Sequence, residues 1–137
     1  MTRVGLLEDD IAIQEMMLLV LQDEGYTVVN YPDAETCLLS LGITGTVVNP
    51  LPIDLLIADW RLSGPITGVE VIRQLRAQSH LAPFAHLATL PVILTTAATY
   101  NDTEELQQLQ VSLLEKPFSV DDIIHLIQHL LISDTSA

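Results

Sequence analysis

Basic residues, cysteines and long apolar runs are all scarce in this sequence, and each scarcity excludes a class of protein. Only 5 lysine and arginine residues stand against 18 acidic ones, and the net charge is −13. This balance argues against direct nucleic-acid binding, which needs basic groups to displace phosphate counterions. The single cysteine, Cys37, cannot form an internal disulfide and is expected to be a packed thiol. No apolar run approaches the roughly 18 residues of a membrane span, so we expect a cytoplasmic protein that binds neither nucleic acid nor membrane.

The remaining composition is that of a compact domain. Hydrophobic residues make up 49% of the 137 residues, and the mean hydropathy is +0.40. This content is enough for one substantial core. We predict a single domain over residues 1–137, with a structured core over residues 3–132 and a short C-terminal tail.

Short apolar segments alternate with segments of helical periodicity along the whole chain. We predict five strands and five helices, and this alternation is typical of an α/β fold with a doubly wound parallel sheet that helices cover on both faces. The predicted strands are Val4–Leu7, Thr27–Tyr31, Ile53–Asp59, Pro91–Thr95 and Val111–Glu115. The predicted helices are Ile11–Glu24, Asp33–Leu41, Gly68–Gln78, one that begins at Asn101 and one that Ser119 caps.

Polar residues stand where several of these strands end. Glu8 and Asp9 follow the first strand, Asp59 ends the third, Thr96 follows the fourth, and Lys116, the only lysine, follows the fifth. In open parallel sheets, chemistry collects at the carboxyl ends of the strands. Carboxylates that met there would repel one another unless a cation neutralised them, and oxygen ligands alone favour Mg²⁺ or Mn²⁺. Taken alone, Asp59 is better explained as an aspartate that ends a strand and caps a helix, and the polar residues at the other strand ends are what favour a reactive carboxylate.

Five segments, in order along nearly the whole chain, resemble the receiver domains of two-component response regulators, the family that includes the chemotaxis response regulator. Each segment alone is a weak signal, and the five together are specific. They are Val4-Gly5-Leu6-Leu7-Glu8-Asp9-Asp10, Asp54-Leu55-Leu56-Ile57-Ala58-Asp59-Trp60-Arg61-Leu62, Thr67-Gly68-Val69-Glu70, Pro91-Val92-Ile93-Leu94-Thr95-Thr96-Ala97 and Glu115-Lys116-Pro117-Phe118-Ser119.

The resemblance implies a fold and a set of site residues. The fold would be flavodoxin-like, with strand order 2-1-3-4-5. Asp59 would accept a phosphoryl group, Thr96 would hydrogen-bond it, and Lys116, followed by a cis peptide bond, would pair with it. The Mg²⁺ or Mn²⁺ ligands would be Asp9, Asp59 and the main-chain carbonyl of Arg61, with Glu8 assisting through water.

The resemblance also implies partners. A sensor histidine kinase or a histidine phosphotransfer protein would supply the phosphoryl group, and the change would alter binding to a downstream protein. The chain would then be a phosphoryl acceptor with slow self-dephosphorylation rather than an enzyme. On a helical wheel Ile11 and Leu18 lie on the outer face of the first helix. The docking residues implied are Ile11, Glu15, Leu18, Leu19, Pro117 and Phe118.

Two other functions stay open at this point. The family usually has an aromatic residue three positions before the lysine, and here that residue is Leu113, which suggests an adaptor that works without phosphorylation. A Mg²⁺-dependent phosphatase with an aspartyl nucleophile would have a second aspartate two residues after the first as acid and base. That position holds Arg61, so the phosphatase reading is the weaker one.

Overall fold

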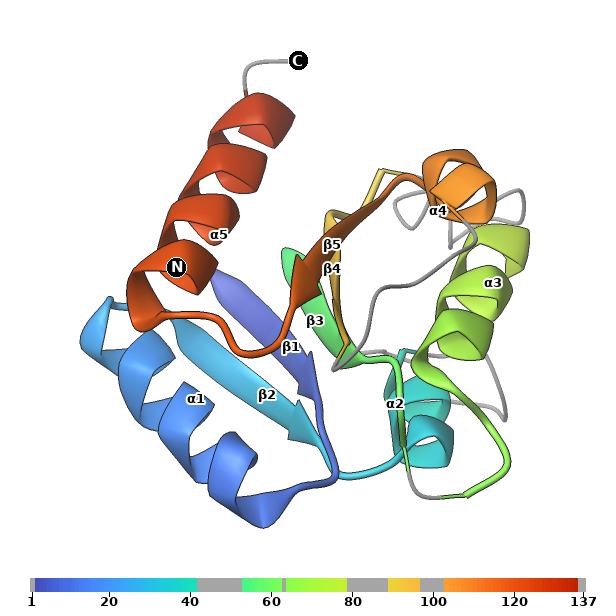
Figure 1. The fold of residues 1–137 in the computed structure, drawn as a ribbon, viewed down its shortest axis with the longest axis horizontal. Helices are drawn as coiled ribbons and strands as arrows, with labels where there is room; N and C mark the ends of the chain where they lie inside the picture. The colour runs from blue at the N-terminus through green and yellow to red at the C-terminus, as the bar shows by residue number, and fades with distance from the viewer. Residues whose placement is uncertain (1, 42–52, 63, 79–88, 97–102, 136–137) are drawn as a thin grey trace.

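The computed structural model describes residues 2–41, 53–62, 64–78, 89–96 and 103–135. Strands and helices alternate strictly within these ranges, as predicted (Figure 1). The strands are β1 (Arg3–Leu7), β2 (Thr27–Tyr31), β3 (Leu55–Asp59), β4 (Val92–Thr96) and β5 (Val111–Glu115). The helices are α1 (Ile11–Asp23), α2 (Ala34–Ser40), α3 (Gly68–Gln78), α4 (Thr103–Leu109) and α5 (Val120–Thr135). The predicted cap at Asn101 lies outside the described residues.

The five strands form one parallel sheet in the order β2-β1-β3-β4-β5, which confirms the predicted fold class and topology. Strands β3 and β4 are buried along their entire length. A strand that is covered on both faces cannot alternate apolar and polar residues, and this is why these two segments read as continuous apolar runs. Because all of the paired strands are parallel, their carboxyl ends lie at the same edge of the sheet.

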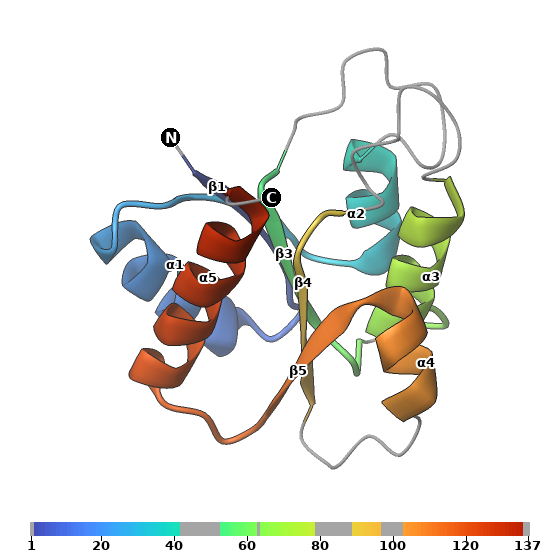
Figure 2. The same cartoon turned by 90° about the horizontal axis from the view of Figure 1, so that it is seen from above.

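Two apolar clusters lie on opposite faces of the sheet. Helices α2, α3 and α4 cover one face, and α1 and α5 cover the other (Figure 2). The first cluster includes Cys37, whose side chain is fully buried as predicted. Burial raises the pKa of its thiol to about 12, which keeps the thiol protonated and unreactive at neutral pH. None of the helices in the described ranges has the length and apolarity to cross a membrane.

Side chains cap four of the helices in the described ranges, and at the start of α3 the hydroxyl of Thr67 accepts a hydrogen bond from the N–H of Glu70. The carboxylates of Asp10 and Asp33 accept hydrogen bonds from the main-chain N–H groups of Ile13 and Thr36 at the starts of α1 and α2. Before α5, the Ser119 hydroxyl accepts from the N–H of Asp122, and the Asp122 carboxylate accepts from the N–H of Ser119. These bonds satisfy donors that a helix start otherwise leaves unpaired, and they confirm the predicted cap at Ser119.

Candidate functional site

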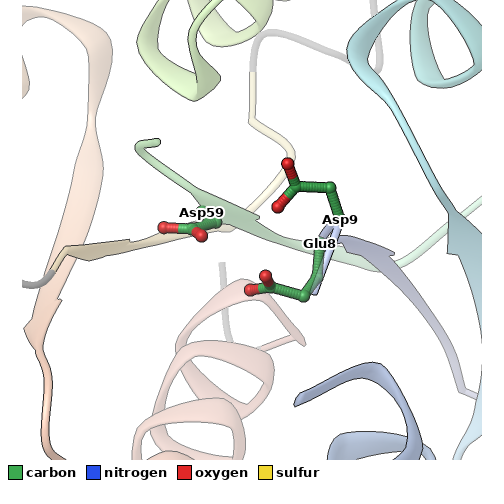
Figure 3. Close-up of side chains that lie close together, drawn as sticks. All are labelled: Glu8, Asp9 and Asp59. Carbon is green, nitrogen blue, oxygen red and sulfur yellow. The ribbon is translucent and has the colours of Figure 1, made fainter. Parts of the chain in front are cut away.

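Three carboxylates meet where β1 and β3 end. The two strands are paired with Leu7 opposite Ala58, so the residues that follow Leu7 come next to Asp59. One oxygen each from Glu8, Asp9 and Asp59 lies within 4.8 Å of the others (Figure 3). The sequence placed these three acids at one edge of the sheet, and the structure brings them together.

The only lysine of the chain faces this acidic cluster. Its Nζ lies 3.3 Å from Oδ2 of Asp59 and 4.0 Å from Oε2 of Glu8. Glu8 and Asp59 are buried, with 3% and 7% of their surfaces exposed, while Asp9 is half-buried. One ammonium group therefore faces three carboxylates, two of which are buried away from water.

Glu8 shows the effect of its burial in this cluster. Burial raises its pKa from 4.5 to about 7, and the nearby negative charges of Asp59 and Asp9 add to the increase. The N–H of Asp10, which donates to Oε1 of Glu8 at 3.1 Å, and the charge of Lys116 act in the opposite direction. The amide of Gln14 donates to the main-chain carbonyl of Glu8 and holds this turn against α1. Burial and the neighbouring carboxylates together disfavour the charged form of Glu8.

Two adjacent threonines end β4, and they differ in their position relative to the acidic cluster. Thr96 is buried at the last position of the strand, and its carbonyl accepts a 2.7 Å hydrogen bond from the N–H of Lys116. Thr95 pairs with Asp59 across the sheet and lines the same small cavity as Asp59 and Lys116. The sequence pointed to Thr96 alone, and the position of Thr95 beside this cavity was not expected. Register was the missing signal, because residues opposite each other on parallel strands point to the same face.

The segment after β3 folds back on the site. The N–H of Trp60 donates to the carbonyl of Thr95 at 2.8 Å, and the N–H of Gly68 donates to the carbonyl of Trp60 at 3.1 Å. A Cβ atom on Gly68 would lie 2.2 Å from the carbonyl oxygen of Asp59, so only glycine fits at the start of α3. The N–H of Arg61 donates to Oδ1 of Asp59 at 3.3 Å, and the guanidinium of Arg61 lies 5.3 Å from the centre of the Trp60 ring.

The residues expected to dock a partner are not equally accessible. Ile11 and Leu19 are 69% and 70% exposed on α1. The prediction that Leu18 is exposed was wrong. It is half-buried because, with Val28 and Asn30, it lines a pocket between α1 and the edge strand β2. Of the other residues expected to dock a partner, Glu15 and Pro117 are exposed, whereas Phe118 is half-buried against the apolar cluster beneath α1 and α5. The Lys116–Pro117 peptide bond is cis, as predicted.

The fold and the site define a class of protein: a doubly wound parallel α/β domain with a buried aspartate, two further acids and a lysine at the carboxyl ends of its strands. The family model for the response regulator receiver domain matches residues 4–128. The chain belongs to this family, whose members are the receiver domains of two-component signalling.

Comparison with individual proteins agrees with this assignment. A probable transcriptional regulatory protein of Picosynechococcus is 29% identical over 132 residues, which are 94% of this chain and 49% of that protein. The chain thus spans about half the length of this relative. A chemotaxis protein of Vibrio cholerae has the same fold, with a TM-score of 0.77 at 23% identity over 95% of this chain and 98% of the other. So does the receiver domain of a Pseudomonas aeruginosa sensor histidine kinase, which holds a magnesium ion in its active-site cleft, with a TM-score of 0.76 at 24% identity over 95% and 97%.

Proposed function

We propose that Asp59 accepts a phosphoryl group from a phosphohistidine of a partner protein, and that the phosphorylated state changes how this chain binds another protein. The observation that carries the proposal is the contact of 3.3 Å between the Asp59 carboxylate and the only lysine of the chain, beside two further acids. A buried carboxylate beside a lysine and two further acids is suited to attack phosphorus when further positive charge is supplied.

The proposed step exchanges one bond for another. A carboxylate oxygen of Asp59 attacks the phosphorus, a P–O bond forms, and the P–N bond of the phosphohistidine breaks. The imidazole nitrogen leaves with the bonding electron pair. The ammonium of Lys116 pairs with the transferred oxygens, and the hydroxyl of Thr96 donates a hydrogen bond to them. The chain is then a reactant that hydrolyses its own adduct slowly, and not an enzyme with a separate substrate.

The donor set fits magnesium. The cluster offers carboxylate oxygens, and oxygen atoms are the ligands that Mg²⁺ and Mn²⁺ prefer. Three carboxylates this close together favour a divalent cation. The proposed ligands are Asp9, Asp59 and the main-chain carbonyl of Arg61, with Glu8 bound through water. When bound, the cation neutralises negative charge on the phosphoryl oxygens. The magnesium ion held by the Pseudomonas aeruginosa relative supports this assignment.

The proposed donor is a sensor histidine kinase or a histidine phosphotransfer protein in the cytoplasm. Apolar residues that are exposed next to charged ones mark a surface that a partner can cover. Ile11, Glu15 and Leu19 form such a surface on α1, with Leu18 at its inner border. The other two residues expected to dock a partner follow β5, where Pro117 is exposed and Phe118 packs half-buried against the apolar cluster beneath α1 and α5.

Labelling at Asp59 tests the proposed function. The protein is incubated with Mg²⁺ and ³²P-labelled acetyl phosphate, and we expect an adduct that is stable in acid and labile in base. Asp59→Asn abolishes the adduct. Asp10→Asn is the matched control, because asparagine preserves the cap of α1 and leaves labelling unchanged. Absence of an adduct in the native protein, or its survival in Asp59→Asn, would overturn the proposal.

A second candidate function, an adaptor that binds its partner without phosphorylation, is favoured by Leu113. This residue packs half-buried against the apolar cluster beneath α2, α3 and α4 and offers no aromatic ring to change position. The two functions differ in how affinity responds to beryllofluoride, which imitates the phosphoryl group. Partner affinity that stays the same with Mg²⁺ and beryllofluoride would favour the adaptor.

A further inference from the structure

Two of the four arginines of this acidic chain join α3 to α4. Nη2 of Arg73 lies 2.6 Å from Oε1 of Glu105, and its Nε donates to the same oxygen at 2.7 Å. Nε of Arg76 donates to the carbonyl of Leu109, the last residue of α4, at 2.9 Å. Half of the arginines of this chain, which has only 5 basic residues, thus connect the same two helices.

Arg76 makes the more buried of the two connections. Its Nη2 also donates to the carbonyls of Leu90 at 2.9 Å and Gln110 at 3.4 Å, so one guanidinium joins α3, the entry to β4 and the turn before β5. Burial lowers the pKa of Arg76, yet the group stays charged and makes charge-assisted hydrogen bonds. At this turn Gln110 has a φ of 58°, a left-handed conformation that a side chain rarely adopts without support.

Arg73 makes the more exposed connection. It lines, with Glu104 and Glu105, an open pocket of about 410 Å³ between α3 and α4. Water and salt reach this ion pair and weaken it. Arg73 also pairs with Glu70, one turn earlier on α3, at 2.9 Å. The same guanidinium therefore makes one contact within α3 and one contact to α4.

The opposite end of α3 touches the phosphoacceptor. Gly68 begins the helix, its N–H is bonded to the carbonyl of Trp60, and its Cα is packed against the carbonyl of Asp59. Helix α3 has 11 residues, which corresponds to about 16 Å at 1.5 Å per residue. A continuous rod of helix thus connects the main chain of Asp59 to α4 and to the turn before β5.

We propose that α3 and α4 move as one unit, and that this unit transmits the phosphorylation state of Asp59 to α4 and the turn before β5. This proposal rests on the proposed function. It assigns to Arg73 and Arg76 the coupling role that an aromatic residue at position 113 would otherwise fill. A change in the main chain at Asp59 displaces the start of α3, and the two arginines carry the displacement to α4.

Two isosteric variants separate coupling from a general loss of charge. Glu105→Gln removes the negative charge that pairs with Arg73 on α4, whereas Glu70→Gln removes the one that pairs with it on α3. Amide chemical shifts are recorded in a titration with Mg²⁺ and beryllofluoride. We expect the shift changes over residues 103–113 to fall at least twofold in Glu105→Gln and to stay unchanged in Glu70→Gln. The changes at Trp60 and Arg61 should be the same in all three proteins.

Two more variants test the buried contacts of Arg76 and the alternative route through position 113. Arg76→Lys keeps the charge and loses the fork that reaches several carbonyls, so the response of residues 103–113 should again fall at least twofold. Leu113→Val should leave that response unchanged. The coupling would be overturned if residues 103–113 responded as in the native protein in both Glu105→Gln and Arg76→Lys. It would also be overturned if this response were lost in Leu113→Val. Neither result would contradict phosphorylation of Asp59. No response at Trp60 and Arg61 in the native protein would instead overturn the proposed function, and the coupling with it.

Discussion

The Cα atom of Gly68 lies against the main-chain carbonyl of Asp59, so that a Cβ atom at position 68 would stand 2.2 Å from the carbonyl oxygen. Both partners in this contact belong to the backbone, and neither can rotate away as a side chain would. The start of α3 therefore fixes where the proposed phosphoacceptor lies.

Gly68→Ala should accordingly harm both stability and the site. We expect a loss of about 2–3 kcal/mol in the free energy of unfolding, because the overpacking has no flexible atom to absorb it. Displacement of Asp59 should weaken Mg²⁺ binding by about 10- to 100-fold, the usual effect when a group that positions a ligand is lost. Urea unfolding measures the first quantity. Fluorescence of Trp60, the only tryptophan and the neighbour of Asp59, measures the second.

Gly25→Ala is the control for this experiment. Gly25 has a φ of 91° and open space around its missing side chain, so alanine introduces backbone strain without a clash. The strain costs about 1–2 kcal/mol. Gly25 lies between α1 and β2, away from the acidic cluster, and Mg²⁺ affinity should not change. Equal loss of affinity in both variants would show that lower stability, and not the position of Asp59, is the cause.

Tyr31→Phe should leave the protein as stable as before or stabilise it by about 1 kcal/mol, because a buried polar group without a hydrogen bond is unfavourable. The hydroxyl of Tyr31 is buried under α2 and has no hydrogen-bond partner among the described residues. Burial also raises its pKa. Thermal unfolding of Tyr31→Phe, with the half-buried Tyr26→Phe as control, measures the effect. A loss of more than about 1 kcal/mol would mean that the hydroxyl is paired after all.

The sequence predicted the elements of this fold because each one has a signal along the chain itself. Buried parallel strands read as apolar runs, and the carboxylates at their ends follow from where the runs stop. The meeting of Glu8, Asp9 and Asp59 was predictable for this reason. Their roles as ligands and acceptor, and that of Thr96, remain predictions.

Contacts between elements had no such signal. Nothing in a single sequence tells that Arg76 reaches the carbonyl of Leu109, or that Gly68 rests on Asp59. The exposure of Leu18 was predicted wrongly for the same reason, since a helical wheel does not show how far the edge strand extends under the helix. These relationships depend on the packing of helices on the sheet, which is decided in three dimensions.

The pKa of Glu8 predicts how stability depends on pH in the absence of divalent cations. It is about 7 in the folded protein against 4.5 as the ordinary value, so between these pH values the folded state binds more protons than the unfolded state. Stability should therefore fall as the pH rises from 4.5 to 7, by on the order of 3 kcal/mol from this residue. Glu8→Gln should remove this slope and be the more stable protein at pH 8.

Urea unfolding at several pH values in EDTA measures the effect of Glu8. Glu15→Gln is the matched control, because it removes an exposed carboxylate from the neighbouring helix and should keep the native slope. Addition of Mg²⁺ should stabilise the native protein at pH 8 by binding the folded state only. If the stability of Glu8→Gln depended on pH as that of the native protein does, Glu8 would not be the residue that causes the dependence.

Replacement of Lys116 separates its part in phosphoryl transfer from its part in holding the cluster together. In Lys116→Met the charge that pairs with the transferred oxygens is lost, and labelling by acetyl phosphate should slow by about 10²- to 10³-fold. Mg²⁺ affinity should move in the opposite direction. The ammonium lies 3.3 Å from Asp59 and repels a divalent cation at the same carboxylates, so its removal should tighten binding by about 1 kcal/mol, or roughly fivefold.

Lys116→Arg is the control, because it keeps the charge while changing the shape of the group, and its Mg²⁺ affinity should stay close to the native value. Trp60 fluorescence gives the affinity and radiolabel incorporation gives the rate for each protein. Opposite changes in Lys116→Met identify a cation that acts on the phosphoryl group. If affinity and labelling were lost together, Lys116 would be holding the three carboxylates in place, and its role in the transfer would have to be abandoned.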